Sequence, residues 1–140
     1  MNRAGEPQDP SESYSPAMLL AEAHRAAEAA YAPYSGTQVG AALLCSHGHV
    51  YAGCNIEVVN LSGSICAERS ALAQAISAGC RSFAYVAVVS SKMPECYPCG
   101  VCREVLAEFG PVKVLVEGSS SGENLTTELA TLLPHHPHVP

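Results

Sequence analysis

The sequence predicts one α/β domain in which a mixed sheet carries helices on both faces. Three observations support this fold class. The chain has 140 residues, which is enough for one domain with a substantial core but hardly for two. Its hydrophobic content of 48% and charged content of 14% suit a globular protein. Segments with helical and strand patterns alternate as helix, hairpin, helix, strand, helix, strand and helix, and this order favours a sheet covered on both faces.

The first helix is expected to follow a polar tail. Residues 1–15 are rich in Ser, Glu and Pro, and we expect them to form a flexible tail. A helix is expected from Pro16, because proline is favoured in a first helical turn and Leu and Ala residues follow. Pro33 restricts the residue before it, so the helix should end before that position. The domain should span residues 16–134, with a C-terminal tail at 135–140.

A hairpin and a second helix are expected next. Residues 39–45 form an apolar segment of strand length, and residues 50–57 return as a second strand. The turn between them, residues 46–49, contains a glycine. A helix is then expected from about residue 66 to residue 78, with Gly79 as its stop.

The last third of the chain predicts two more strands and two more helices. Residues 83–89 are mostly β-branched or aromatic, which favours a buried strand. A helix is expected to open at Cys99 and to end near Gly110. Residues 112–116 read as a further strand, and residues 123–133 predict a last helix that the following proline ends.

Charge argues against a polynucleotide as substrate. The formal net charge is −6, with seven Lys and Arg residues in total. Binding to nucleic acid depends mainly on neutralising phosphates, and this chain has few cations for it. A small nucleoside fits the composition better.

The seven cysteines favour metal binding over disulfides. The sequence has no evident signal peptide or membrane span, so we expect a cytoplasmic protein in a reducing compartment. Cys45, Cys54 and Cys80 lie outside the motifs described below, and we expect them to be small buried apolar residues.

Two short segments carry the predicted chemistry. Cys66-Ala67-Glu68 and Pro98-Cys99-Gly100-Val101-Cys102 together offer three thiols and one carboxylate. Three cysteine ligands leave one position of a zinc tetrahedron open, which is typical of a catalytic site. Both segments are expected to open helices, where the positive end of the helix dipole favours thiolates. The pattern of a ligand, a glutamate that does not ligate, and Pro-Cys-x-x-Cys is typical of zinc deaminases that act on nucleobases.

The expected reaction is hydrolytic deamination. Zinc would lower the pKa of bound water, and Glu68 would take its proton and pass protons to the ring nitrogen and the departing ammonia. Three thiolates and Zn²⁺ sum to −1. Arg69 and Arg103 are expected to offset that charge by hydrogen bonding to the sulfurs.

Other interpretations of the cysteines stay open at this point. A Cys-x-x-Cys pair that follows a strand and opens a helix also occurs in redox dithiols, although such a fold does not require Cys66 and Glu68. A structural zinc ribbon needs a second pair of similar spacing, and the sequence has none. Cys96 lies close enough to Cys99 to be a fourth candidate ligand.

Seven motifs, in order, give a more specific indication than any one of them. They are Pro33-Tyr34-Ser35, Val39 to Leu44, Gly53 to Glu57, Ile65 to Arg69, Pro98-Cys99-Gly100, Cys102-Arg103 and Leu132-Leu133-Pro134. From about residue 29 to residue 133 the chain thereby resembles the small homotetrameric zinc-dependent cytidine deaminases, a family that includes relatives resembling blasticidin S deaminase. The resemblance implies a three-layer α-β-α fold and conversion of cytidine or deoxycytidine to uridine or deoxyuridine plus ammonia.

The resemblance also implies roles for particular residues. One zinc ion per chain would bind to Cys66, Cys99 and Cys102, and Glu68 would be the proton shuttle. The chain would form a homotetramer that serves pyrimidine salvage.

The resemblance assigns the substrate-binding residues as well. Asn55 and Glu57 would hold ribose hydroxyls, and the backbone of Ala67 would contact the pyrimidine. Residue chemistry supports the first pair independently, because two polar side chains at a spacing of two share one face of a strand.

Four departures from the family pattern affect the expected pocket. Thr37 stands where the family usually has an aromatic residue, and residues 58–61 differ from the usual continuation after Asn-Ile-Glu. Glu104 replaces a glutamine, and residues 135–138 replace a segment that often contains phenylalanine. Stacking on an aromatic side chain contributes about 1–3 kcal/mol per base in single-strand binding.

Because of these departures we consider an alternative substrate. We also compare two other functions for the chain. The alternative is a modified or antibiotic cytosine nucleoside of the blasticidin S type, with His135 or His136 near its polar group. A polynucleotide-editing deaminase is disfavoured by the acidic charge. A zinc-binding or redox module without catalysis is disfavoured by Glu68.

Overall fold

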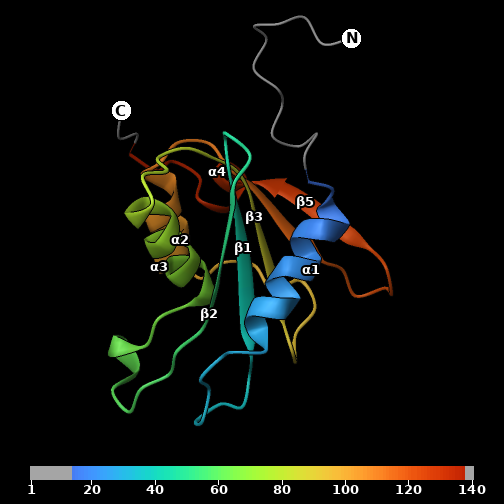
Figure 1. The fold of residues 1–140 in the computed structure, drawn as a ribbon, viewed down its shortest axis with the longest axis vertical. Coiled ribbons are helices and arrows are strands. Elements are labelled where there is room, and N and C mark those ends of the chain that lie inside the picture. The colour runs from blue at the N-terminus through green and yellow to red at the C-terminus, as the bar shows by residue number, and fades with distance from the viewer. Residues whose placement is uncertain (1–13, 138–140) are drawn as a thin grey trace, which may run out of the picture.

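A five-stranded mixed sheet forms the centre of the computed structural model, which describes residues 14–137 (Figure 1). Most of the two tails expected at residues 1–15 and 135–140 lies outside these described residues. The strand order is β2-β1-β3-β4-β5, in which β3 and β4 are parallel and the other neighbours are antiparallel. The strands are β1 (Val39–Cys45), β2 (Val50–Cys54), β3 (Phe83–Ser90), β4 (Lys113–Glu117) and β5 (Asn124–Glu128).

Helices cover both faces of this sheet, so the predicted three-layer α-β-α class is confirmed. The helices are α1 (Pro16–Ala27), α2 (Ala67–Ser77), α3 (Gly100–Ala107) and α4 (Leu129–Leu132), with one 3₁₀ turn at Leu61–Gly63. Helix α1 lies on one face, and α2 and α3 lie on the other (Figure 1). Within residues 14–137, none of the helices has the length and apolar character needed to cross a membrane.

Alternate residues of β1 face the two helical layers. Ala42 and Leu44 pack with the apolar side of α1, whereas Ala41 and Leu43 belong to the core beneath α2. This alternation follows from the two-residue period of a strand. Close approach of the layers also requires glycine, because a Cβ on Gly40 would overlap the carbonyl oxygen of Ala23 in α1.

The predicted strand at residues 50–57 ends earlier than expected. Strand β2 stops at Cys54, after which Ile56 forms isolated bridges with Tyr31 and Ile65. The backbone of Asn55 accepts a hydrogen bond from the Tyr31 N–H at 3.1 Å. The chain therefore leaves the sheet and pairs with two loops, one of which leads into α2.

The predicted helix at residues 123–133 is wrong for its first half. Residues 124–128 form edge strand β5, and α4 is confined to the four residues that follow. Leu125 and Thr127 are half-buried while Thr126 is exposed, which is the two-residue alternation of a strand. β-Branched threonines and pairing with β4 outweigh the short helical pattern here.

Cys45 and Cys80 are joined by a disulfide, which corrects the expectation that this chain uses cysteine for metal rather than for disulfides. Their Cα atoms are 6.4 Å apart, within the usual range for a bridge. Both residues are buried, as expected, but Cys54 is only half-buried and is free. The bridge forms because the end of β1 lies beside the chain that leaves α2, with the Ser46 N–H donating to the Ser82 carbonyl at 3.0 Å. No feature of the spacing, 35 residues along the chain, predicts this pairing.

Candidate active site

Two helix N-termini bring the three predicted thiols together. Cys66 is the N-cap of α2 and Cys99 is the N-cap of α3, both with extended backbone and without a side-chain capping hydrogen bond. Their sulfurs are therefore free to turn toward each other. Cys102 lies in the first turn of α3 and is buried. The three residues form the group that we call the thiol trio.

The sulfurs of the thiol trio have the spacing of a metal site. The Sγ atoms of Cys66 and Cys99 are 3.6 Å apart, and all three Sγ atoms lie within 4.8 Å of one another. Zinc–sulfur bonds of about 2.3 Å in a tetrahedron place sulfurs about 3.8 Å apart. The arrangement therefore fits one zinc ion with a fourth position left open. Cys96, which the sequence offered as a fourth ligand, is buried outside this group, and burial raises the pKa of its thiol to about 11.

Glu68 is the one buried charged residue among those described, with 4% of its surface exposed. It stands in the first turn of α2, and its Oε2 atom is 3.8 Å from the Cys102 sulfur. Burial raises the pKa of its carboxyl above the ordinary value. A carboxyl with a raised pKa binds a proton more tightly, which suits a group that takes up and releases a proton.

Charge within the thiol trio is unequally shared. A hydrogen bond from Cys102 lowers the pKa of the Cys66 thiol to about 5, and the same contact together with burial raises the pKa of Cys102. Of the two thiols, Cys66 is therefore the more acidic. Arg69 Nη2 is 3.5 Å from the Cys66 sulfur and 3.4 Å from the Ser64 carbonyl oxygen. This is the contact that the sequence predicted for Arg69.

Arg103 makes a different set of contacts from the one predicted. Its Nε donates to the Pro98 carbonyl at 2.7 Å and its Nη1 donates to the Leu132 carbonyl at 3.0 Å. The Arg103 guanidinium thus donates to carbonyl groups of the preceding loop and of α4. Within residues 14–137 it forms no hydrogen bond to a sulfur. The expectation that Arg103 offsets thiolate charge by such a bond is wrong, and its contacts instead fix the loop that delivers Cys99.

The predicted substrate-binding residues Asn55 and Glu57 follow β2, and Thr37 precedes β1. The Asn55 Oδ1 accepts from the Val39 N–H at 2.8 Å, and its Nδ2 donates to the Thr37 carbonyl at 2.9 Å. Asn55 therefore fastens the start of β1. Thr37 is half-buried, and its N–H donates to Ser35 Oγ at 3.0 Å.

Glu57 holds the turn before β1 at a second point. Its Oε1 accepts the N–H groups of Tyr34 and Ser35 at 3.1 and 3.0 Å. Hydrogen bonding from Ser35, first through its hydroxyl, lowers the pKa of the Glu57 carboxyl. Glu57 is therefore an ionised acceptor at neutral pH.

The predicted histidines lie elsewhere. His135 and His136 line a surface hollow of about 420 Å³ with residues of α3 and α4, among them Ala107 and Leu129, and no member of the thiol trio lines it. His136 Nε2 is 3.0 Å from a carboxylate oxygen of Glu104. Within this chain, the two departures from the family pattern at Glu104 and His136 are thus paired with each other.

Removing the buried charge of Glu68 is expected to stabilise the metal-free protein. Between the unfolded pKa of Glu and the raised folded pKa, the folded chain holds a proton that the unfolded chain has lost, so stability falls as pH rises. Glu68→Gln should therefore raise the free energy of unfolding at about pH 7 by roughly 1 kcal/mol, and the gain should vanish below about pH 4. Urea unfolding in the presence of a chelator measures it. A gain that is independent of pH, or a loss, would contradict this assignment.

Comparison with known proteins agrees with the geometry. Residues 14–117 match the family model described as the cytidine and deoxycytidylate deaminase zinc-binding region. The chain is 47% identical over 118 residues to the cytidine deaminase of Sporosarcina psychrophila, covering 83% of this chain and 86% of that protein. It is 29% identical over 105 residues to the blasticidin-S deaminase of Bacillus cereus, covering 69% of this chain and 74% of that protein.

Solved structures give the same result for the fold. The cytidine deaminase of Burkholderia pseudomallei superposes with a TM-score of 0.77 at 41% identity, covering 84% of this chain and 94% of that one. The cytidine deaminase of Mycobacterium tuberculosis superposes with a TM-score of 0.75 at 34% identity, covering 87% and 96% of the two chains.

Proposed function

This chain belongs to the cytidine and deoxycytidylate deaminase family, and we propose that Cys66, Glu68, Cys99 and Cys102 form the site at which it hydrolyses cytidine and deoxycytidine to the uracil nucleosides and ammonia. One observation carries the assignment. Three thiols from two helix N-termini converge beside a single buried carboxylate. A structural zinc site would have no use for that carboxylate, because burying it costs free energy.

The reaction divides between the metal and Glu68. The thiol trio would hold a zinc ion, which would supply a Lewis acid and lower the pKa of water toward neutrality. The Glu68 carboxylate accepts the proton of the attacking water, while a C–O bond forms at the ring carbon that carries the amine. Glu68 passes that proton to the ring nitrogen, then takes the remaining proton of the added hydroxyl group and delivers it to the amine. The C–N bond breaks, the new oxygen becomes a carbonyl, and ammonia leaves.

Arg69 adjusts the charge of this site. Its guanidinium donates to the Cys66 sulfur, and it offsets part of the −1 charge that three thiolates and Zn²⁺ would carry. A less negative site is the stronger Lewis acid, because the hydrogen bond withdraws electron density from the sulfur. Arg103 acts indirectly, because its hydrogen bond to the Pro98 carbonyl holds the loop that precedes Cys99.

We assign the nucleoside to the surface between these residues and the loops at Asn55 and Glu57. The ionised Glu57 is an acceptor for ribose hydroxyls, and Asn55 keeps the adjacent backbone in place. Ala67 would offer its backbone to the pyrimidine, and Thr37 would form part of the wall.

We propose a homotetramer, and exposed apolar side chains support it. Val59 and Leu61 are 81% and 74% exposed, and Ile65 and Val101 beside the thiol trio are also exposed. Large apolar side chains with this much exposure are candidates for burial in an interface between subunits. A role in pyrimidine salvage in the cytoplasm is consistent with a site that needs reduced thiols.

A second candidate substrate is a modified cytosine nucleoside of the blasticidin S type. The observation that favours it is Thr37 in place of an aromatic side chain, together with the 29% identity to a blasticidin-S deaminase. The stronger similarity to cytidine deaminases supports cytidine and deoxycytidine first.

Substrate assignment is tested by the loss of absorbance on deamination. We expect cytidine and deoxycytidine to be turned over by the zinc-loaded protein with kcat/KM at least about tenfold above that for blasticidin S, the difference of one or two contacts. Glu57→Ala should raise KM for cytidine by about tenfold or more with a smaller change in kcat. The control is Glu108→Ala at the exposed C-cap of α3, which should leave both constants unchanged. Preference for blasticidin S would transfer the assignment to the second candidate.

A further inference from the structure

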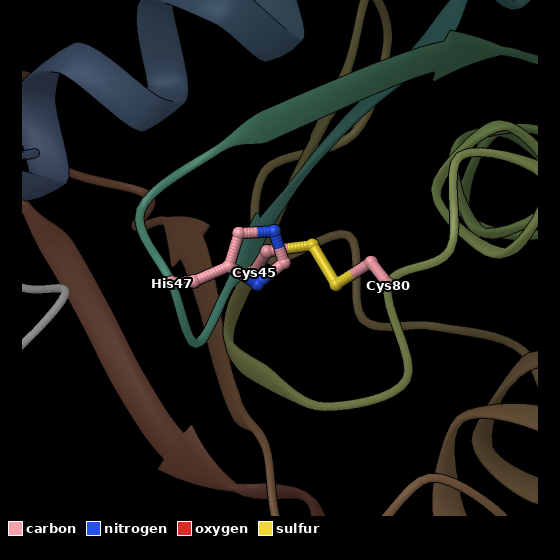
Figure 2. Close-up of side chains that lie close together, drawn as sticks. All are labelled: Cys45, His47 and Cys80. Atoms are coloured by element: carbon pink, nitrogen blue, oxygen red, sulfur yellow. A yellow bond between two sulfur atoms is a disulfide. The ribbon is translucent and has the colours of Figure 1, made fainter.

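A second group of metal-ligating side chains lies outside the thiol trio. Cys45, His47 and Cys80 place two sulfurs and one imidazole nitrogen within 4.8 Å of one another. Figure 2 shows the imidazole of His47 beside the Cys45–Cys80 bridge. The thiol trio is at the N-terminal end of α2, whereas Cys80 follows its C-terminal end. An α-helix of 11 residues is roughly 16 Å long, so the two groups do not share a ligand ion.

The backbone around this second group is held by several hydrogen bonds. The Cys45 N–H donates to the His49 carbonyl at 2.8 Å, and the Gly48 N–H donates to the Cys45 carbonyl at 2.9 Å. Gly48 has a φ of 96°, a conformation that glycine adopts readily. The Cys80 N–H donates to the Ala75 carbonyl at 2.9 Å. Cys45, His47 and Cys80 therefore lie on a hairpin turn and a helix end whose backbones are held by hydrogen bonds.

Burial and exposure of the three side chains suit an ion that enters from solvent. Cys45 and Cys80 are 0% and 2% exposed, while His47 is exposed at the tip of the turn. Two thiolates would be costly to bury alone, and a divalent cation cancels their charge. Two sulfurs and an imidazole form a donor set that zinc prefers, and solvent can complete the tetrahedron on the exposed side.

We propose that Cys45, His47 and Cys80 form a second, redox-gated site for a thiophilic divalent ion such as Zn²⁺. The disulfide closes the site, and reduction opens it. A dithiol reductant transfers two electrons and two protons to the disulfide, which becomes two thiols while the reductant becomes a disulfide. The two thiols then release two protons as they bind the ion. The ion holds the end of β1 against the end of α2 in the reduced protein, where the disulfide holds them in the oxidised protein.

The site is tested by counting zinc in the two redox states. Protein is reduced with a phosphine, which does not offer a competing thiol, then equilibrated with zinc under anaerobic conditions and desalted. We expect two zinc ions per chain after reduction, but one after oxidation by a low-molecular-weight disulfide that leaves the zinc-protected thiol trio intact. One ion per chain in both states would overturn the proposal.

Variants and cobalt spectra identify the ligands. Cys80→Ala should lower the reduced count from two to one, whereas Cys54→Ala, which alters a free cysteine outside both groups, should leave it at two. His47→Ala should weaken binding of the second ion by tenfold or more, with His49→Ala as the matched control from the same turn. In the reduced wild-type protein, the second equivalent of Co²⁺ should add thiolate-to-cobalt charge-transfer absorption. If that equivalent binds without such absorption, the sulfurs are not its ligands and the proposal fails, even if a variant does not fold.

These measurements separate this proposal from the catalytic assignment. Loss of the first ion in Cys102→Ala concerns the thiol trio alone. A second ion that persists in that variant supports the proposed site, while its loss there would show that the two groups are not independent.

Discussion

Replacement of Glu68 by glutamine is expected to lower kcat for cytidine by about 10³- to 10⁴-fold while the protein retains its zinc. Glutamine keeps the shape of the side chain and its place in the first turn of α2, where 4% of the residue is exposed. It neither accepts the proton of the attacking water nor donates one to the leaving amine. Because the site has no other buried carboxylate within residues 14–137, no neighbour is placed to substitute for it.

Steady-state kinetics and metal analysis check this result together. Glu108→Gln provides the matched control, since it changes an exposed glutamate at the C-cap of α3 and should leave kcat within a factor of two. Retention of more than a tenth of wild-type kcat by Glu68→Gln would refute the proton-shuttle role. Loss of zinc in the same variant would instead place Glu68 among the ligands.

Replacement of Cys102 by alanine is expected to abolish zinc binding at the thiol trio and, with it, detectable turnover. Cys102 is fully buried between the two helix ends, and two remaining thiols leave the ion with half of its tetrahedron unfilled by protein. Metal content should fall from one ion per chain to none when it is measured in the oxidised protein, in which the Cys45–Cys80 disulfide keeps the second site closed.

Cys96→Ala is the matched control for this variant. Cys96 is also buried and lies three residues before Cys99, but it is outside the group of ligating sulfurs. We expect it to retain one zinc ion and wild-type kcat. Zinc binding that survives in Cys102→Ala but not in Cys96→Ala would reverse the assignment of the two residues.

The parts of the fold that the sequence predicted are those in which local pattern and tertiary packing agree. The apolar segment at residues 39–45 is a central strand with helices on both faces, so nearly every position favours burial. Strand β5 was missed because an edge strand is specified largely by its partner. Its residues 124–128 contain two threonines, but they also fit the start of an amphipathic helix until β4 is known to lie beside them.

The sequence predicted those parts of the candidate site whose residues lie in short motifs. The spacing of the cysteines in Cys-Ala-Glu and Pro-Cys-x-x-Cys predicts that each motif lies at the N-terminus of a helix. The contacts of Arg103 with the Pro98 and Leu132 carbonyls depend on how α4 packs beside α3, and no local sequence pattern specifies that packing. Cys45, His47 and Cys80 lie together because a hairpin turn packs beside a helix end. No local sequence pattern predicts that contact.

The bridge between Cys45 and Cys80 places some residues of the candidate site inside a covalent ring and leaves others outside it. It closes a covalent ring over a sequence separation of 35, and the ring contains β2, α2, Cys66 and Glu68, whereas Cys99 and Cys102 lie outside it. A ring of this size removes about 3–4 kcal/mol of conformational freedom from the denatured chain. When the chain unfolds, the segment that contains Cys66 and Glu68 is therefore held to the hairpin by the bridge as well as by the backbone, whereas Cys99 and Cys102 are connected to it by the backbone alone.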